Sequence, residues 1–487
     1  MNYSIIRRTL GFLLLFEAIF FLLPLITAVI YWETAFFAFL ISIAVCVLVG
    51  GVLIWKKPKD SSIYTKEAFV IVALGWIVMS LFGALPFCLS GEIPSYVDAL
   101  FETVSGFTTT GATIMNSGAE VEALPKSILM WRSFTHWIGG MGVLVFILAI
   151  TSKTTDRSMH ILRAEMPGPI VDKFVPKART TTLILYIIYT AMTLLLIILL
   201  LCGGMPLFDS VLHAFGTAGT GGFGMKADGL ASYSPYIQWV ITVFMFLFGI
   251  NFNLYFLILV GKLRPVFKST ELWVYTLIFV CATAIIAVDI YDLCYNLEHT
   301  IRTAAFQVSS IITTTGFATT DFNTWPTLSK SVLLFLMFTG ACAGSTAGGF
   351  KISRFIILIK KIGNNLKKVI HPRTATVVKF EGKRLDEDTL NGVSSYFDIY
   401  VIIFIIVFLL LSLDTGVISI TAIETNLASA LSCLNNIGPG LAMTGPTGSY
   451  AGYSYFSKIV LSLTMLIGRL EIYPILLTLN IATWIKR

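Results

Sequence analysis

Four stretches of the chain share one pattern: DALFETVSGFTTTG (98–111), DSVLHAFGTAGTGG (209–222), TAAFQVSSIITTTG (303–316) and TNLASALSCLNNIG (425–438). Each joins an apolar piece of about a dozen residues to a small, polar end that closes on glycine. A helix that crosses a ~30 Å hydrocarbon core needs about 20 residues, so these pieces are too short to span a membrane. The fourfold pattern therefore predicts four re-entrant half-helices in equivalent positions.

The stretches align on their last residues, Gly111, Gly222, Gly316 and Gly438. Thirteen residues earlier stand the expected N-caps of the half-helices, Asp98, Asp209, Thr303 and Thr425. The side-chain oxygens of Asp and Thr accept hydrogen bonds from the first free amides of a helix. Each half-helix would then direct its partly negative C-terminal end toward a common centre.

The polar ends of the stretches indicate a cation pore. Backbone carbonyls and Thr hydroxyls are hard oxygen ligands that can replace the water around a monovalent cation. Glycine permits a positive φ and lets backbones crowd around an axis. The four tips hold no Asp or Glu, which disfavours a divalent-cation filter. The alternative, a Thr- and Gly-rich surface for helix packing, explains one such stretch better than four aligned ones.

The composition indicates an integral membrane protein. Of 487 residues, 56% are hydrophobic and 13% charged, with a mean hydropathy of +0.84. Soluble domains carry about 25% charge, so a soluble enzyme is excluded. The seven cysteines form no CxxC pair and imply no disulfide framework or zinc site. The apolar runs predict ten transmembrane helices, at 9–31, 35–55, 68–89, 127–151, 181–203, 236–260, 272–291, 328–359 (interrupted), 397–418 and 454–484.

The distribution of Lys and Arg predicts the topology. With an even number of spans both termini face the same side, and the basic residues gather in both termini and in the loops expected at 56–67, 152–180, 261–270 and 351–396. The positive-inside rule then predicts cytoplasmic termini. The formal net charge of +7 is interpreted as this topology signal, with anionic lipid rather than nucleic acid as the partner. The loop 351–396 is either a lipid-facing surface or a docking site for a regulatory partner.

Two features inside the expected spans point to the pore path. GACAGSTAGG (340–349) interrupts the eighth span, and each Gly costs ~1 kcal/mol relative to Ala in a helix. This favours a broken helix over a packing seam, with candidate gating residues at Gly340, Gly344, Gly348 and Gly349. Arg469 lies about halfway along the last span, where a charge is expensive.

Arg469 would act as an electrostatic barrier to cations or as a structural partner of an acid or of carbonyl ends. Glu471, two residues away, is expected to point elsewhere. Glu17 is the other intramembrane carboxylate and is assigned to packing or to a dimer contact. His136 is the one histidine expected near the pore, and the sequence assigns it no role.

Several motifs resemble a known group. TTTGAT (108–113), GTGGFG (219–224), TTTGFATTDF (313–322) and NNIGPG (435–440) are similar to the four pore loops of the Trk/Ktr/HKT superfamily of potassium transporters. HWIGGMG (136–142), GACAGSTAGGFK (340–351) and GRLEIYP (468–474) resemble its inner helices. The resemblance covers essentially the whole chain. The two extra spans at 9–55 make it most similar to the membrane subunits of bacterial Trk systems.

The resemblance implies an all-α membrane protein with four membrane–pore–membrane repeats around one pseudo-fourfold pore. A two-helix extension at 1–60 would precede repeats at 61–160, 161–265, 266–375 and 376–487. The potassium ligands would be the carbonyls of Thr109, Thr110, Gly111, Thr220, Gly221, Gly222, Thr314, Thr315, Gly316, Asn436, Ile437 and Gly438. The segment 340–349 would form a gating loop beneath this filter, with Arg469 as the barrier.

The resemblance also implies potassium uptake across a bacterial inner membrane, with no catalytic residues and no organic cofactor. Four key glycines favour potassium over sodium. The implied partners are a second copy of the chain and a cytosolic nucleotide-binding regulatory subunit like TrkA. Two other functions remain open. A symporter coupled to H⁺ or Na⁺ would need a coupling-ion site, typically a membrane carboxylate, and a membrane-embedded enzyme would need a clustered acid/base set.

Overall fold

The computed structural model describes residues 1–57, 64–116, 118–142, 178–226, 228–372, 377–414, 416 and 420–484. The second half of the fourth expected span, most of the expected loop 152–180, and Lys486 and Arg487 lie outside the described residues. Within them all regular secondary structure is helical apart from one antiparallel hairpin, β1 (Lys379–Phe380) and β2 (Lys383–Arg384). In its register Lys379 faces Arg384 and Phe380 faces Lys383.

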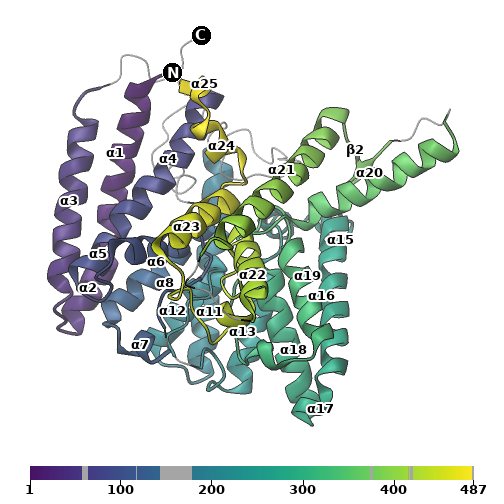
Figure 1. The fold of residues 1–487 in the computed structure, drawn as a ribbon, viewed down its shortest axis with the longest axis horizontal. Coiled ribbons are helices and arrows are strands. Elements are labelled where there is room, and N and C mark those ends of the chain that lie inside the picture. The colour runs from purple at the N-terminus through teal and green to yellow at the C-terminus, as the bar shows by residue number, and fades with distance from the viewer. Residues whose placement is uncertain are drawn as a thin grey trace.

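The N-terminal helices form a separate layer at one edge of the molecule (Figure 1). It consists of α1 (Tyr3–Phe20), α2 (Leu22–Ile30) and α3 (Phe36–Ile54). Helices α1 and α3 approach closely because Gly11 and Gly50 face one another: a Cβ on either would lie 2.9 Å from the carbonyl oxygen of the other. Small residues at such crossings let membrane helices pack backbone to backbone.

Glu17 lies inside this layer. Its side chain is fully buried, and neither carboxylate oxygen has a hydrogen-bond partner among the described residues. A contact with a second copy of the chain is therefore wrong for this side chain, and the packing interpretation remains. An ionised carboxylate without a partner is very costly at such a place.

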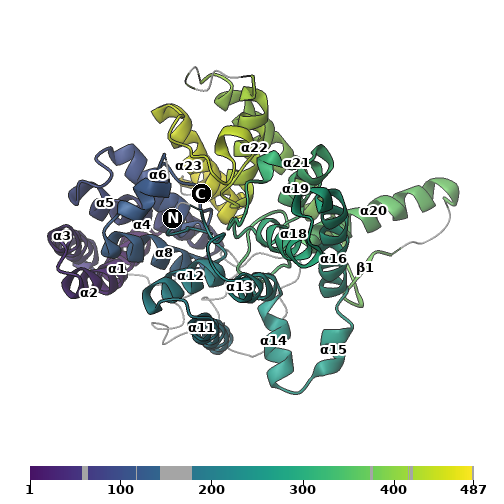
Figure 2. The same cartoon turned by 90° about the horizontal axis from the view of Figure 1, so that it is seen from below.

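The remaining helices form four groups around a centre, and Figure 2 shows them in chain order. The first group comprises α4 (Thr65–Gly83), α5 (Leu85–Leu89), α6 (Tyr96–Phe107), α7 (Gly118–Ala123) and α8 (Lys126–Gly140). The second comprises α11 (Ala178–Cys202), α12 (Leu207–Gly219), α13 (Pro235–Phe248), α14 (Phe252–Leu259) and α15 (Leu263–Phe267). Helices α1–α3 lie outside the first group.

The third group comprises α16 (Thr270–Asp289), α17 (Tyr291–Cys294), α18 (Leu297–Ile312), η1 (Phe322–Thr324), α19 (Thr327–Thr339) and α20 (Ile352–Ile370). The fourth comprises α21 (Glu387–Leu411), α22 (Ala422–Asn435), η2 (Ala442–Thr444), α23 (Tyr455–Arg469), α24 (Tyr473–Leu479) and α25 (Ile481–Trp484). The N-terminus and α25 lie at one end of the molecule and α17 at the other, while α20 projects from the body (Figure 1).

Six described helical segments are long and apolar enough to cross a membrane, which makes the chain a multi-pass membrane protein. They are Tyr3–Ile30, Phe36–Ile54, Thr65–Leu89, Thr182–Cys202, Thr270–Asp289 and Glu387–Leu411. A seventh candidate is the pair α13 and α14, which meet at an angle of 92°. The sequence predicts one continuous span at 236–260, and this is wrong: the helix stops at Phe248 and restarts behind Asn251, whose side chain caps α14.

Four short helices, α6, α12, α18 and α22, occupy the positions predicted for the half-helices, a name we keep for them, and they begin earlier than predicted. Their N-caps are Ser95, Pro206, Asn296 and Thr421. The predicted N-caps are wrong, since Asp98, Asp209, Thr303 and Thr425 lie inside the helices. Each first turn still carries an acid that suits the positive end of the helix dipole: Asp98, Asp209, Glu298 and Glu424.

The contact between α1 and α3 predicts unequal effects at two adjacent glycines. Gly50→Val places side-chain carbons against the Gly11 carbonyl and should lower the stability of the folded protein by about 1–3 kcal/mol. A Cβ on Gly51 meets nothing within 4 Å, so Gly51→Val is the matched control and should have no such effect. Thermal unfolding of both variants in detergent checks this. Equal melting temperatures would contradict the close α1–α3 contact.

Candidate ion pore

The loops that follow the four half-helices repeat one backbone conformation. Two residues before each aligned glycine, a non-glycine residue has a φ of 54–56°: Thr109, Thr220, Thr314 and Asn436. Such left-handed residues are uncommon outside glycine. The aligned glycines also have positive φ, from 75° at Gly222 to 100° at Gly438. The fourfold repeat is therefore present in the backbone conformation as well as in the amino-acid sequence.

The four aligned glycines form a closed ring of contacts with the neighbouring loops. A Cβ on any of them would lie well inside 3.0 Å of a carbonyl oxygen of the next loop. The pairs run Gly111 to Gly221, Gly222 to Thr315, Gly316 to Ile437, and Gly438 back to Thr110. Each loop touches the next and the fourth touches the first. We call these four glycines and their loops the glycine ring.

Several hydroxyl groups of the glycine ring are used by the protein itself. The hydroxyls of Thr108 and Thr110 share a hydrogen bond of 2.8 Å, and those of Thr313 and Thr315 do the same. The Asn436 amide donates to the Thr110 hydroxyl at 3.0 Å and to the Met465 carbonyl. These bonds fix the loops from behind. These hydroxyls are therefore already engaged within the protein.

Two cavities adjoin the glycine ring and the 340–351 segment. The larger, of about 320 Å³, is lined by all four ring glycines, by Arg132 of α8 and by Lys226, Asp228 and Asp321 of the following loops. The smaller, of about 60 Å³, is lined by the ends of broken inner helices and by the 340–351 segment, including Gly140, Gly344, Gly348, Gly349 and Arg469. The described residues hold no group of three His, Cys, Asp or Glu placed to bind a metal ion.

The inner helices all stop near the ring. α8 ends at Gly140, α13 at Phe248, α19 at Thr339 and α23 at Arg469. Sequence reasoning located only the third stop. Glycine was the missed signal: a Cβ on Gly139 would collide with the Phe107 carbonyl, and one on Gly468 with the Leu434 carbonyl, both in half-helices. These glycines let the inner helices lie against the half-helices.

The predicted interruption of the eighth span is present as a loop between Thr339 and Ile352, which we call the 340–351 loop. Gly340, Gly344 and Gly349 have positive φ. The Gly348 amide donates to the Thr314 hydroxyl of the glycine ring at 2.6 Å. The loop also pairs with the break between α13 and α14, through Cys342 N–H to Gly249 O at 3.1 Å and Phe252 N–H to Gly344 O at 3.0 Å.

Arg469 links the C-terminal end of α8 to the 340–351 loop. Its guanidinium donates to the carbonyls of Gly139 and Gly140 at 2.5 and 2.7 Å, and to that of Thr346 at 3.0 Å. Glu471 points elsewhere, as expected, and forms a buried ion pair with Arg354. Arg469 is thus a structural bridge to carbonyl ends, and its positive charge lies at the smaller cavity beside the 340–351 loop.

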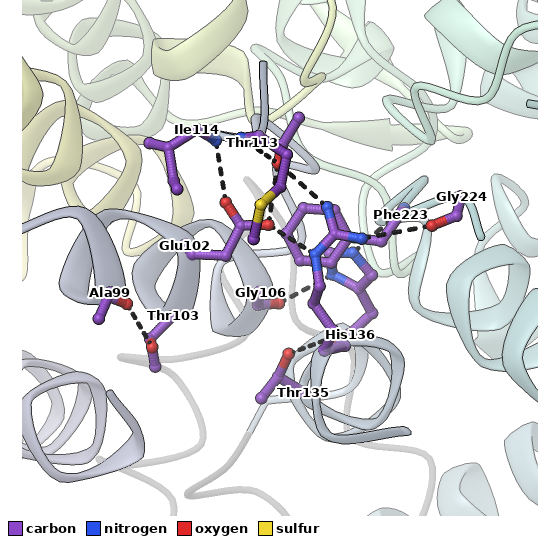
Figure 3. A network of polar contacts seen from close by, with 12 residues as sticks. Ala99, Glu102, Thr103, Gly106, Thr113, Ile114, Thr135, His136, Phe223 and Gly224 are labelled. Carbon is purple, nitrogen blue, oxygen red and sulfur yellow. Dashed lines mark hydrogen bonds and ion pairs between the residues drawn. The ribbon is translucent and has the colours of Figure 1, made fainter. Parts of the chain in front are cut away.

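A polar network that sequence reasoning missed ties the first two loops together (Figure 3). The buried Glu102 of α6 pairs with Arg132 of α8 at 2.6 Å and accepts from the Ile114 amide at 3.0 Å. Arg132 also donates to the Gly224 carbonyl and stacks 3.8 Å over the ring of Phe223. The partners are 12 to 92 positions apart, so no local pattern reveals them.

His136, to which the sequence assigns no role, belongs to the same polar network (Figure 3). We call Glu102, Arg132 and His136 the brace. Its Nδ1 lies 2.9 Å from the Gly106 carbonyl, and its Nε2 accepts from the Phe223 amide at 3.4 Å. Donation from Nδ1 and acceptance at Nε2 require the neutral ring. A Cβ on Gly221 would overlap this imidazole, so the histidine supports the second loop from behind.

The brace predicts an asymmetric cost of losing carboxylates. Glu102→Ala strands the buried Arg132 guanidinium and should lower the free energy of unfolding by about 3–5 kcal/mol. Glu424→Ala removes an exposed first-turn acid of another half-helix and should cost about 0.3–1 kcal/mol. Melting temperatures of both variants provide the measurement. Similar small losses would show that the Glu102 pair does not brace the loops.

Residues 35–483 match the TrkH family, described as a cation transport protein. The Trk system potassium uptake protein TrkH of Salmonella typhimurium is 34% identical over 99% of this chain and 100% of its own length. TrkG of Escherichia coli, also named a Trk system potassium uptake protein, is 31% identical over 99% and 98%. The crystal structure of the potassium transporter TrkH from Vibrio parahaemolyticus matches with a TM-score of 0.88 at 30% identity, covering 100% of both chains. These matches confirm the resemblance predicted from the glycine-ended motifs: the chain belongs to the TrkH family of cation transport proteins.

Proposed function

We propose that this chain takes up potassium through a channel-like pore whose selectivity filter is the glycine ring. The closed cycle of glycine–carbonyl contacts carries the proposal, because four loops that each touch the next would offer their carbonyl oxygens to an ion around one axis. The printed names of the relatives, Trk system potassium uptake proteins, support potassium as the cargo. The ligands would be the carbonyls of Thr109, Thr110, Gly111, Thr220, Gly221, Gly222, Thr314, Thr315, Gly316, Asn436, Ile437 and Gly438.

Transport would proceed down the electrochemical gradient. An ion enters the larger cavity, exchanges its water for filter carbonyls and leaves through the smaller cavity. A negative cell interior contributes about 2.3 kcal/mol per charge for each 100 mV. The 340–351 loop and Arg469 obstruct the exit. Flow therefore requires the loop to move away from the ring, with Gly340, Gly344, Gly348 and Gly349 providing its conformational freedom.

The architecture we assign has ten transmembrane helices and four pore half-helices. A two-helix extension at 1–60 precedes pore repeats at 61–160, 161–265, 266–375 and 376–487. The four groups of helices around one centre support this division (Figure 2). The chain would lie in a bacterial inner membrane with both termini cytoplasmic, since the basic loops share their side with the termini.

The chain would act with partners. The relatives are named as parts of a Trk system, which implies further Trk components. We propose a homodimer that carries a TrkA-like nucleotide-binding subunit on its cytoplasmic face. The projecting helix α20 carries exposed Ile362, Leu366 and Val369 beside lysines in its last turn. Anionic membrane lipid suits such a basic, amphipathic surface.

Coupling to H⁺ or Na⁺ is less well supported than passive flow. A coupled carrier needs an ionisable site on the path, and the unpaired intramembrane carboxylate, Glu17, lies beside Gly83 instead of in either cavity. Glu471 lines the smaller cavity but is paired with Arg354. Asp228 and Asp321 line the larger cavity, but they follow the filter loops instead of standing within them. The filter we assign therefore uses no coupling ion.

Flux through the purified protein in sealed liposomes tests the proposed function. A potassium gradient alone, without a proton or sodium gradient, should drive uptake. Empty liposomes and liposomes with heat-unfolded protein are the controls. Dependence of uptake on an added proton or sodium gradient would contradict passive flow, and absence of potassium flux under every gradient would contradict the proposed function itself.

The glycine ring predicts that a side chain at Gly111 weakens selectivity for potassium over sodium. Gly111→Ser inserts a side chain against the Gly221 carbonyl and should displace that oxygen, so we expect potassium-over-sodium discrimination to fall about tenfold, or about 1.4 kcal/mol. Gly91→Ser is the matched control, since Gly91 also has a positive φ but a Cβ there meets nothing within 4 Å. The flux ratio of the two ions in liposomes is measured. Unchanged discrimination in a folded Gly111→Ser variant would refute the filter assignment.

Two variants of Arg469 separate its charge from its bridging bonds. Arg469→Ala removes both and should raise potassium flux several-fold. Arg469→Lys keeps the charge but cannot reach three carbonyls with one planar group, so an electrostatic barrier predicts flux near wild type. If both variants raise flux equally, the bridge controls the exit instead of the charge. Lost folding in both would limit Arg469 to a structural role.

A further inference from the structure

One carboxylate holds both ends of the 340–351 loop. Glu271 stands in the first turn of α16 and is 5% exposed. Its Oε1 accepts the Ala343 amide at 2.8 Å and the Ser353 amide at 3.1 Å. Ala343 lies near the start of the loop and Ser353 just beyond its end. The two ends are thus tied to one atom of a neighbouring helix.

The hairpin that follows α20 in turn holds the N-terminal end of α16. The Oε1 of Glu381, in the turn between β1 and β2, accepts the Glu271 amide at 3.0 Å and the Ser269 hydroxyl at 3.2 Å. Glu381 and Gly382 both have positive φ, which is typical of a tight two-residue hairpin turn. Lys360 of α20 donates to the Lys379 carbonyl at 3.0 Å and so secures the hairpin.

From these contacts we propose that Glu271 is a positioning residue that latches the 340–351 loop in its closed position, and that Glu381 holds the latch from the hairpin. This inference rests on the proposed function, because it assigns the regulation of the same pore. Amides of a non-helical loop at membrane depth must find acceptors. A carboxylate is a stronger acceptor than a neutral group, so these two bonds stabilise the closed loop.

The arrangement also provides a route from the surface to the pore. The hairpin contacts the start of α16, the start of α16 holds the loop, and the loop holds Thr314 of the glycine ring through Gly348. A cytosolic subunit that displaces the hairpin would withdraw Glu381 from α16 and loosen Glu271. The loop would then leave the ring without any contact between that subunit and the pore.

Basal potassium flux in liposomes tests the latch. Glu271→Ala removes the acceptor of both amides and should raise flux about tenfold, with the potassium-over-sodium ratio unchanged. Glu271→Gln keeps an oxygen at the same position and should return flux to within about threefold of wild type. Glu387→Ala is the matched control, since Glu387 is also a first-turn acid of a spanning helix but is exposed. It should leave flux unchanged.

Glu381→Ala tests the second half of the proposal away from the membrane interior. It should also raise flux, by less than Glu271→Ala does. Combining it with Glu271→Ala should produce no further increase, because Glu381 acts through Glu271. If Glu271→Ala fails to fold, Glu381→Ala and Glu271→Gln still decide. Unchanged flux in Glu381→Ala would overturn the route, and a Glu271→Gln variant whose flux is about tenfold above wild type would overturn the role of the acceptor.

The outcomes separate the latch from the proposed function. Wild-type protein that conducts potassium, with a folded Glu271→Ala variant of unchanged flux, would overturn the latch and leave the pore. A parallel rise in sodium flux that abolishes selectivity would also overturn it, since the substitution would then have disturbed the glycine ring. Wild-type protein without potassium flux would fail the proposed function before any variant is compared.

Discussion

The contact between a glycine Cα and the carbonyl of the next loop is the constraint on which the rest of the structure depends. It occurs four times in a closed cycle, and it admits no Cβ at Gly111, Gly222, Gly316 or Gly438. To bring four loops this close, four half-helices must end at the same depth. The inner helices must then lie against the half-helices, which Gly139 and Gly468 allow by lacking a side chain.

Such crowding creates non-helical backbone inside the membrane, and charged side chains satisfy it. Arg469 donates to the carbonyls left free where α8 ends, and Glu271 accepts amides of the 340–351 loop. Glu102 accepts the Ile114 amide behind the first loop. Each of these charges would be expensive in lipid without a partner. Their placement follows from the broken backbone around the ring, and any role in transport is added to that structural need.

The parts of the structure that sequence predicted are those with a repeated local signature. The four glycine-ended stretches, the interruption at 340–349 and the separate directions of Arg469 and Glu471 belong to this class. The N-caps were misplaced because the half-helices differ in length, from 12 residues in α6 to 16 in α18, so no fixed distance from the glycine marks their start. The bend after Phe248 was hidden by apolar residues on both sides. The brace of Glu102, Arg132 and His136 depends on long-range contacts that no spacing encodes.

The ring shows how one chain combines symmetric backbone with asymmetric side chains. The carbonyls that face the ring glycines belong to Thr110, Gly221, Thr315 and Ile437, four positions with three kinds of side chain. Thr110 binds Asn436, whereas the Ile437 side chain is buried in an apolar cluster. Because the backbone carbonyl is the same in every residue, the loops can keep one arrangement of carbonyl oxygens while their side chains make different contacts. That divergence lets the connection between α19 and α20 supply the 340–351 loop and α23 supply Arg469, so the proposed exit closes while the backbone of the glycine ring keeps its fourfold repeat.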